Sequence, residues 1–187
     1  MRLVAIPLAA GLLSGCFASV PLYEGDTSGV PTQLTRIDDG KVDMGLPPGW
    51  EPAPEATADH AGNWAADIRQ AYRKQVPGGA AILSTICFSM FLSKNAMADT
   101  MRGGIDPNAV QVLGPSRVDS PGMMDAEFEV YDFNTIAEGR SLPFTALIAW
   151  KLDGSIGGCK YGLFMLGPRP AKQTMLNDFL AILGSLS

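Results

Sequence analysis

Apolar and polar residues alternate along several stretches of the chain, as they do in β-strands that bury one face. The alternation predicts strands over residues 42–46 and 80–92. Four further strands are predicted in the second half of the chain, at 109–119, 122–135, 142–153 and 156–167. The Asp153-Gly154 pair between the last two is typical of a hairpin turn.

Three other stretches carry apolar side chains at helical spacing. The first covers 59–76, where Pro77-Gly78-Gly79 would end the helix. Ser93 is a good N-cap for a short second helix that Gly103-Gly104 would end. Residues 169–187 have a broad apolar stripe, which predicts an amphipathic C-terminal helix.

Together these elements predict an α+β fold. We expect a single, mostly antiparallel sheet of about five or six strands, packed by the C-terminal helix and one or two other helices. Within 122–135, Asp125, Glu127 and Glu129 share one face of the strand, and we expect that face to be solvated. The alternative is a hydrolase that uses Glu127 and Glu129 as its pair of carboxylates.

The first fifteen residues combine Arg2 with an apolar run, 3–13. The run is shorter than the about 20 residues that a spanning helix needs, and the pattern is that of an export signal. It ends on Leu13-Ser14-Gly15-Cys16, which resembles the lipobox of bacterial lipoproteins. The resemblance implies that residues 1–15 are removed and that Cys16 carries acyl chains, which would anchor the protein in a membrane.

The residues after the lipobox predict where the protein is sorted and how it is attached. Phe17 rather than Asp follows Cys16, which in the Gram-negative sorting system favours the outer membrane, facing the periplasm. Residues 16–40 are rich in Pro, Gly, Ser, Thr and Asp, and we expect a flexible tether in which 34–37 could dock as an edge strand. Residues 41–187 are expected to form a single domain.

The cysteines divide into two groups. Setting Cys16 aside leaves Cys87 and Cys159, an even pair in an exported protein. They are a candidate disulfide, and two buried thiols are the alternative, because a disulfide needs the two residues to be adjacent in the fold.

The composition argues against several classes of function. The formal net charge is −5 and no basic cluster exceeds Arg73-Lys74, so nucleic acid is not an expected partner. His60 is the only histidine, which excludes a metal site built on several imidazoles. The sequence contains no Cys-x-x-Cys, phosphate-binding loop or dinucleotide fingerprint. We therefore expect no metal, no cofactor and no enzymatic activity.

The stretch "MGLPPGWE" at 44–51, the predicted strand meander and the ending "MLNDFLAILGSLS" at 175–187 resemble the PsbP-like/DcrB-like family. That family includes exported bacterial lipoproteins, a photosystem accessory protein and secretion-effector chaperones. The resemblance implies an α+β fold and a role in binding other proteins rather than in catalysis. The helix expected around Trp64 departs from the family pattern.

We therefore expect a lipid-anchored binding module or accessory factor of an envelope complex, with the membrane and another envelope protein as its partners. The alternative is an immunity or exclusion lipoprotein that blocks a toxin. The candidate interaction surface consists of Trp64, Arg69, Tyr72 and Arg73, because aromatic and Arg side chains dominate the energetics of interfaces. Ordinary packing of an amphipathic helix is the alternative for these four residues.

The lipobox yields a direct test. The Cys16→Ala variant lacks the sulfur that would carry the lipid, so we expect it to lose membrane association and to accumulate as unprocessed precursor. Membrane fractionation and the mass of the protein measure both effects. A variant that fractionates like the wild type would contradict lipidation at Cys16.

Overall fold

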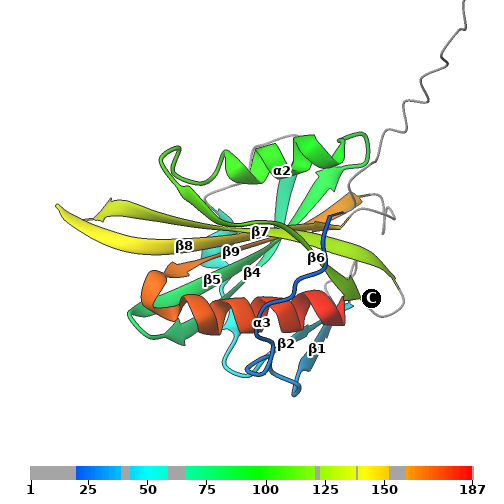
Figure 1. Ribbon diagram of the computed structural model, residues 1–187, viewed down its shortest axis with the longest axis horizontal. Coiled ribbons are helices and arrows are strands. Elements are labelled where there is room, and N and C mark those ends of the chain that lie inside the picture. Colours follow the sequence, from blue (N-terminus) through cyan, green and yellow to red (C-terminus); the bar gives the residue numbers. More distant parts are fainter. Residues whose placement is uncertain are drawn as a thin grey trace, which may run out of the picture.

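The computed structural model describes residues 20–38, 43–58, 66–120, 123–137, 139–151 and 159–186. A seven-stranded sheet lies between two helical layers, with the C-terminal helix on one face and a shorter helix on the other (Figure 1). The helices are α1 (Glu55–Ala58), α2 (Lys94–Arg102), the single-turn η1 (Arg169–Ala171) and α3 (Lys172–Ser185). We call the two sides of the sheet the α3 face and the α2 face.

The large sheet is antiparallel throughout, in the order β3-β4-β5-β9-β8-β7-β6. Its strands are β3 (Glu51–Pro52), β4 (Ala66–Val76), β5 (Gly79–Ser89), β6 (Val110–Ser120), β7 (Met123–Ala137), β8 (Arg140–Lys151) and β9 (Cys159–Pro168). A separate two-stranded sheet pairs β1 (Thr35–Asp38) with β2 (Asp43–Leu46). The α+β class is confirmed, and the sheet has more strands than the sequence predicts.

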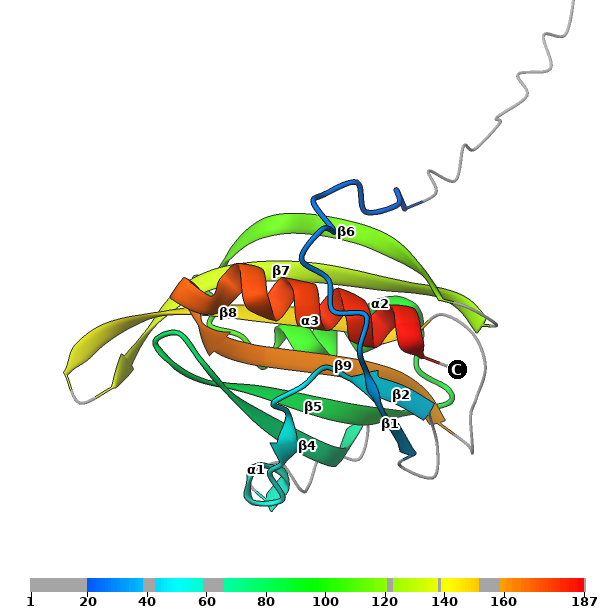
Figure 2. The same cartoon turned by 90° about the horizontal axis from the view of Figure 1, so that it is seen from below.

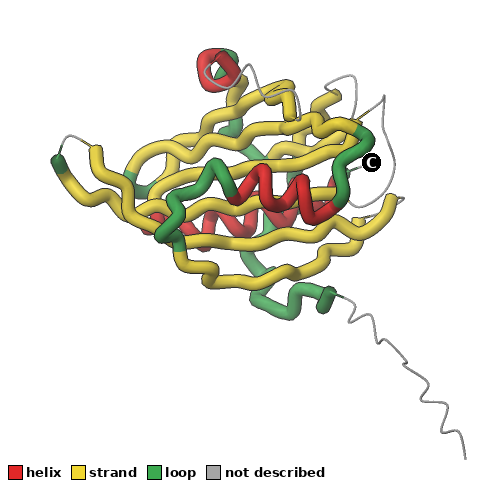
Figure 3. The backbone as a smooth tube through the Cα atoms, turned by 90° about the horizontal axis from the view of Figure 1, so that it is seen from above, coloured by secondary structure: helices red, strands yellow, loops and turns green. Residues whose placement is uncertain are grey.

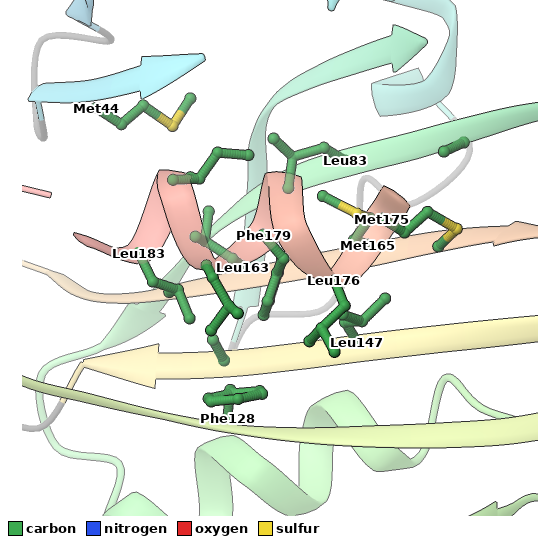
Figure 4. Packing of buried hydrophobic residues seen from close by; sticks show 14 of the residues in the cluster. Met44, Leu83, Phe128, Leu147, Leu163, Met165, Met175, Leu176, Phe179 and Leu183 are labelled. Atoms are coloured by element: carbon green, nitrogen blue, oxygen red, sulfur yellow. The ribbon is translucent and has the colours of Figure 1, made fainter. Parts of the chain in front are cut away.

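The centre of the sheet is apolar on both faces. On the α3 face, Leu83, Met165 and Leu147 lie opposite one another on β5, β9 and β8, and all three are fully buried. α3 packs onto this row, and the ring of Phe179 meets that of Phe128 edge-on with centroids 6.3 Å apart (Figure 4). The predicted C-terminal helix and its apolar stripe are therefore confirmed.

A buried carboxylate attaches α3 to the β3–β4 edge of the sheet. Asp178 of α3 accepts a hydrogen bond from the indole N–H of Trp50 at 3.0 Å and pairs with Lys74 of β4 at 2.6 Å. Trp50 is buried directly after the turn at Gly49, whose φ of +91° suits glycine. A buried charge of this kind is tolerated because it is both paired and hydrogen-bonded.

On the α2 face, the predicted short helix is confirmed. Ser93 is its N-cap and accepts a hydrogen bond from the backbone N–H of Ala96, and the helix ends at Gly103. Met97 and Met101 are buried against the sheet. Seen from above, α2 lies over the sheet and runs roughly along its strands (Figure 3).

The helix expected over 59–76 is wrong for the part that the structure describes, because Ala66–Val76 is strand β4. β4 forms a hairpin with β5, and Gly78 at φ +87° belongs to its turn. A bulge between Ile68 and Gln70 explains the helix-like pattern, since the extra residue reverses which face later side chains occupy. Ile68 consequently packs on the α2 face and Tyr72 on the α3 face, although the two residues are four apart.

The free tether expected for 16–40 does not hold for residues 20–38. The backbone of Pro21 and Tyr23 bonds to Arg117 of β6, and the ring of Tyr23 packs against Phe128 at 5.6 Å. The N-terminal arm, residues 20–34, then crosses over α3 to reach β1 (Figure 2). Although the segment is rich in polar residues, its apolar contacts and backbone hydrogen bonds attach it to the domain. The prediction that 34–37 docks as a strand is confirmed by β1.

No helix in the described ranges is long and apolar enough to cross a membrane. The predicted signal segment at 1–15, Cys16, His60 and Trp64 all lie outside the residues that the structure describes.

The seating of α2 depends on Gly162 of β9. A Cβ at this position would lie 2.6 Å from the ring of Phe88 and 3.3 Å from the sulfur of Met101. Because overpacking a buried site costs about 1–3 kcal/mol, we expect Gly162→Ala to lower the free energy of unfolding by that amount.

Urea denaturation measures this effect, and Gly114→Ala is the matched control. Gly114 also lies in a strand, and nothing is within 4 Å of the position of its Cβ. Equal stability of the two variants would contradict the tight fit at Gly162.

Candidate functional site

The acidic face of β7 is buried rather than solvated. Glu127 and Glu129 are only 3% and 1% exposed, because α2 lies over them. The prediction that this face is solvated is therefore wrong. The alternation within β7 does not show that α2 covers the face and supplies a cation near each of its ends. Lys94 pairs with Glu127, and Arg102 pairs with Glu129.

Arg102 forms a fork with Glu129. Its Nε donates to Oε2 at 2.9 Å and its Nη2 to Oε1 at 2.5 Å. Tyr131 donates to the same Oε2 at 2.7 Å, and the guanidinium lies 5.9 Å from the ring centroid of Trp150. A bidentate pair of this kind is stronger and more directional than a single contact.

The same contacts shift two pKa values. The hydrogen bond to Glu129 raises the pKa of Arg102, so the guanidinium stays charged at every accessible pH. Burial raises the pKa of the Tyr131 phenol, and the hydrogen bond that Tyr131 donates to Glu129 acts in the same direction. Tyr131 therefore remains a neutral donor through the physiological range.

This arrangement fixes α2 to the sheet and gives the two carboxylates a structural use. Each carboxylate faces a cation on α2 instead of an open cleft. The argument for a hydrolase needed Glu127 and Glu129 to be available to a substrate, and the structure gives it no support. Within the described ranges, no group of three or more His, Cys, Asp or Glu side chains could hold a metal ion.

A surface groove lies at the other end of β7. We call it the β6 groove; its volume is about 720 Å³, and it is lined by residues from the loop before β6, from β6, β7 and β8, and from η1. These residues are Asp106, Asn108, Val110, Val112, Asp132, Phe133, Asn134, Thr135, Ile136, Ser141 and Arg169. The β7–β8 hairpin beside it projects beyond the body of the domain (Figures 1 and 2).

Apolar side chains are unusually exposed in the β6 groove. Val110 and Ile136 are 64% and 79% exposed, and Val112 is also exposed. Single exposed apolar residues are ordinary, but several in one groove with polar residues around them are typical of an interaction site. Leu142, on β8 opposite Thr135, is also exposed, but it lies on the other face of the hairpin from Ile136 and does not line the groove.

The base of the β6 groove is held by polar contacts. Arg169 donates to the backbone oxygen of Phe133 at 2.6 Å and to Oδ1 of Asn134 at 3.2 Å. Asp132 accepts from Thr145 at 2.7 Å and pairs with Lys172 at 3.0 Å. These contacts connect β7, β8, η1 and the start of α3, so the groove is formed before any partner binds.

The predicted interaction surface is not assembled. Arg69 and Arg73 are exposed on β4, but Tyr72 is buried in the core beneath α3. Because neighbouring residues of a strand point to opposite faces, Tyr72 and Arg73 cannot share a surface. Reading the segment as a helix is what placed them together.

Of the remaining predicted site residues, Cys87 is disulfide-bonded. Its partner stays a prediction: the backbone of Cys159 lies opposite Ser89 in the pairing of β5 with β9, two residues from the Cys87–Tyr161 pair. This neighbouring backbone position is compatible with the predicted bond to Cys159. The structure describes the backbone of Cys159 but not its side chain.

Sequence reasoning missed the β6 groove. Val110 and Val112 belong to a strand that the pattern predicts, but Ile136 lies one residue past the predicted end of the 122–135 strand. The sequence also does not tell an outward-facing Val or Ile from an inward-facing one. The available signal was the placement of Val110 and Ile136 among polar neighbours at the strand ends.

The fold and site together define a small three-layered α+β domain, with helices on both faces of its large sheet and a preformed surface groove. No protein-family model matches the chain, and no curated relative is detected. LpqN, which is involved in cell envelope biogenesis of Mycobacterium tuberculosis, is structurally similar. Its TM-score is 0.50 at 12% sequence identity, and the match covers 83% of this chain and 90% of that chain.

A structure from Bacteroides thetaiotaomicron matches 81% of this chain and 46% of its own length, at 13% identity and a TM-score of 0.40. At this level of identity, the likeness to LpqN shows a shared fold. The resemblance to the PsbP-like/DcrB-like family stays a prediction.

The fork between Arg102 and Glu129 can be tested by stability. Removing one partner of a buried pair leaves a desolvated charge, so we expect Arg102→Met to lower the free energy of unfolding by at least about 2 kcal/mol. Asp99→Asn removes an exposed partner of the same guanidinium, and we expect a loss below about 1 kcal/mol. Chemical denaturation compares them. If the two variants lost the same stability, the prediction that the buried carboxylate of Glu129 needs Arg102 as its partner would be wrong.

Proposed function

We propose that this chain is a lipid-anchored envelope lipoprotein that acts as a non-enzymatic binding module, and that its β6 groove receives another protein of the cell envelope. The observation that carries the proposal is the exposure of Val110, Val112 and Ile136 in a groove whose base is already rigid. An apolar centre with a polar rim is the common anatomy of a protein interface.

The chemistry of the groove indicates what kind of partner it fits. Three charged residues line the groove, Asp106, Asp132 and Arg169, and each already forms hydrogen bonds or ion pairs within the domain. The parts left for a partner are the apolar side chains, Ser141, and the hydrogen-bonding groups of Asn108 and Asn134 that the contacts within the domain do not use. We therefore propose a partner that inserts apolar side chains and forms neutral hydrogen bonds around them, rather than a strongly charged ligand.

The location is proposed on separate grounds. The lipobox at 13–16 supports lipidation of Cys16, and Phe17 supports placement in the outer membrane, facing the periplasm. The structural likeness to LpqN, a protein involved in cell envelope biogenesis, supports a role as an accessory factor there.

Crosslinking and pull-down from membranes, with the native anchor present, test the proposal. Ile136→Asp places a charge on the most exposed apolar residue that lines the groove, and we expect it to lower partner recovery at least about tenfold, the equivalent of about 1.4 kcal/mol. Ile136 is exposed, so the fold should not suffer, and its denaturation midpoint should be unchanged.

Arg73→Ala is the matched control, because Arg73 is the exposed member of the surface expected from the sequence. We expect it to recover the partner as the wild type does. If Arg73→Ala lost the partner and Ile136→Asp kept it, the interface would lie on β4 and the groove proposal would be wrong.

A further inference from the structure

We infer that the membrane anchor holds the domain with the outer edge of β6, at Leu22 and Arg117, facing the lipid surface. This inference rests on the proposed lipidation of Cys16. It adds an orientation and a contact surface, which lipidation alone does not specify.

The first observation is where attachment of the chain to the sheet begins. The carbonyl of Pro21 accepts from the backbone N–H of Arg117 at 2.8 Å, and the N–H of Tyr23 donates to the carbonyl of Arg117 at 3.0 Å. Leu22 thus forms a parallel bridge to the edge strand of the large sheet. The ring of Tyr23 adds an edge contact with Phe128 in the core.

The second observation is how little chain separates this point from Cys16. Five residue steps lead from Cys16 to Pro21, and a fully extended chain covers at most about 3.6 Å per step, which gives about 18 Å. A flexible tether of 24 residues would instead average roughly 25–30 Å and leave the domain free to turn. The short connection restricts which side of the domain can approach the bilayer.

The third observation is the character of the surface at that point. Leu22 is 45% exposed, so an apolar side chain lies beside the attachment point. Glu24 and Asp26, which follow it, are exposed and acidic. Acidic side chains are repelled by anionic headgroups, so charge does not draw this edge to the membrane; the acyl chains supply the affinity and the short connection supplies the orientation.

The orientation has a consequence for the β6 groove. Val110 and Arg117 belong to the same strand, seven residues apart, which corresponds to about 23 Å. The anchor and the groove therefore lie at the two ends of one edge strand. The groove is carried close to the membrane, where a partner in the same membrane can reach it.

Site-specific fluorescence tests the orientation. A fluorophore is attached to Leu22→Cys and, as the matched control, to Arg73→Cys in the full lipidated protein; the protein without an introduced cysteine gives the background. Arg73 lies on β4, five strands from β6, or about 24 Å across the sheet. The proteins are placed on phosphatidylethanolamine–phosphatidylglycerol vesicles that contain a headgroup spin-labelled lipid.

We expect the spin label to quench the fluorophore at position 22 at least about twofold more than the one at position 73, because nitroxide quenching acts at short range. A 24-residue Gly/Ser insertion after Ala18 should abolish the difference, since it restores a long tether. Equal quenching at both positions in protein that floats with the vesicles would overturn the orientation alone. Failure to float would overturn the lipid anchor, and the orientation with it.

Discussion

The fork between Arg102 and Glu129 determines what the second face of the sheet can be. β8 and β9 present apolar side chains on both faces, so each face needs a cover. On the α2 face that cover must also lie over two carboxylates of β7, which would be costly to bury alone. α2 meets both requirements, because its methionines fill the apolar surface and its terminal cations neutralise the acids.

The opposite face is closed by a different arrangement of the same kind. α3 brings Asp178 into the core, where Trp50 and Lys74 satisfy it, and the N-terminal arm lies across the outside of the helix. The arm extends the layer beyond α3 and ends in β1. Both helices are therefore held on the sheet in two ways. Each packs its apolar side chains against the sheet, and each carries a charged residue that pairs with an oppositely charged residue distant in the sequence.

Much of this fold could be predicted from the sequence, namely the elements whose local sequence pattern matches the environment that they occupy in the fold. β5 and β7, the capped helix α2 and the amphipathic α3 follow from alternation, from Ser93 and from one apolar stripe. β4 could not be predicted, because the bulge after Ile68 imitates helical spacing. The burial of Glu129 depends on Arg102, 27 residues away, and no pattern within either element contains that contact.

The candidate site escaped prediction for a related reason. A groove arises where elements end at different lengths, and the β6 groove exists because the β7–β8 hairpin extends past its neighbours while β6 forms the edge (Figure 1). Its apolar residues look like core residues in the sequence. Val110 lies on the edge strand β6, and Ile136 lies on β7 past the Val110–Asp132 pair at which β6 begins, so in the described part of the chain no strand pairs with β7 on that side of Ile136. The edge strand β6 is thus the place where the chain enters the domain, and its first residues line the groove in which we propose that a partner docks.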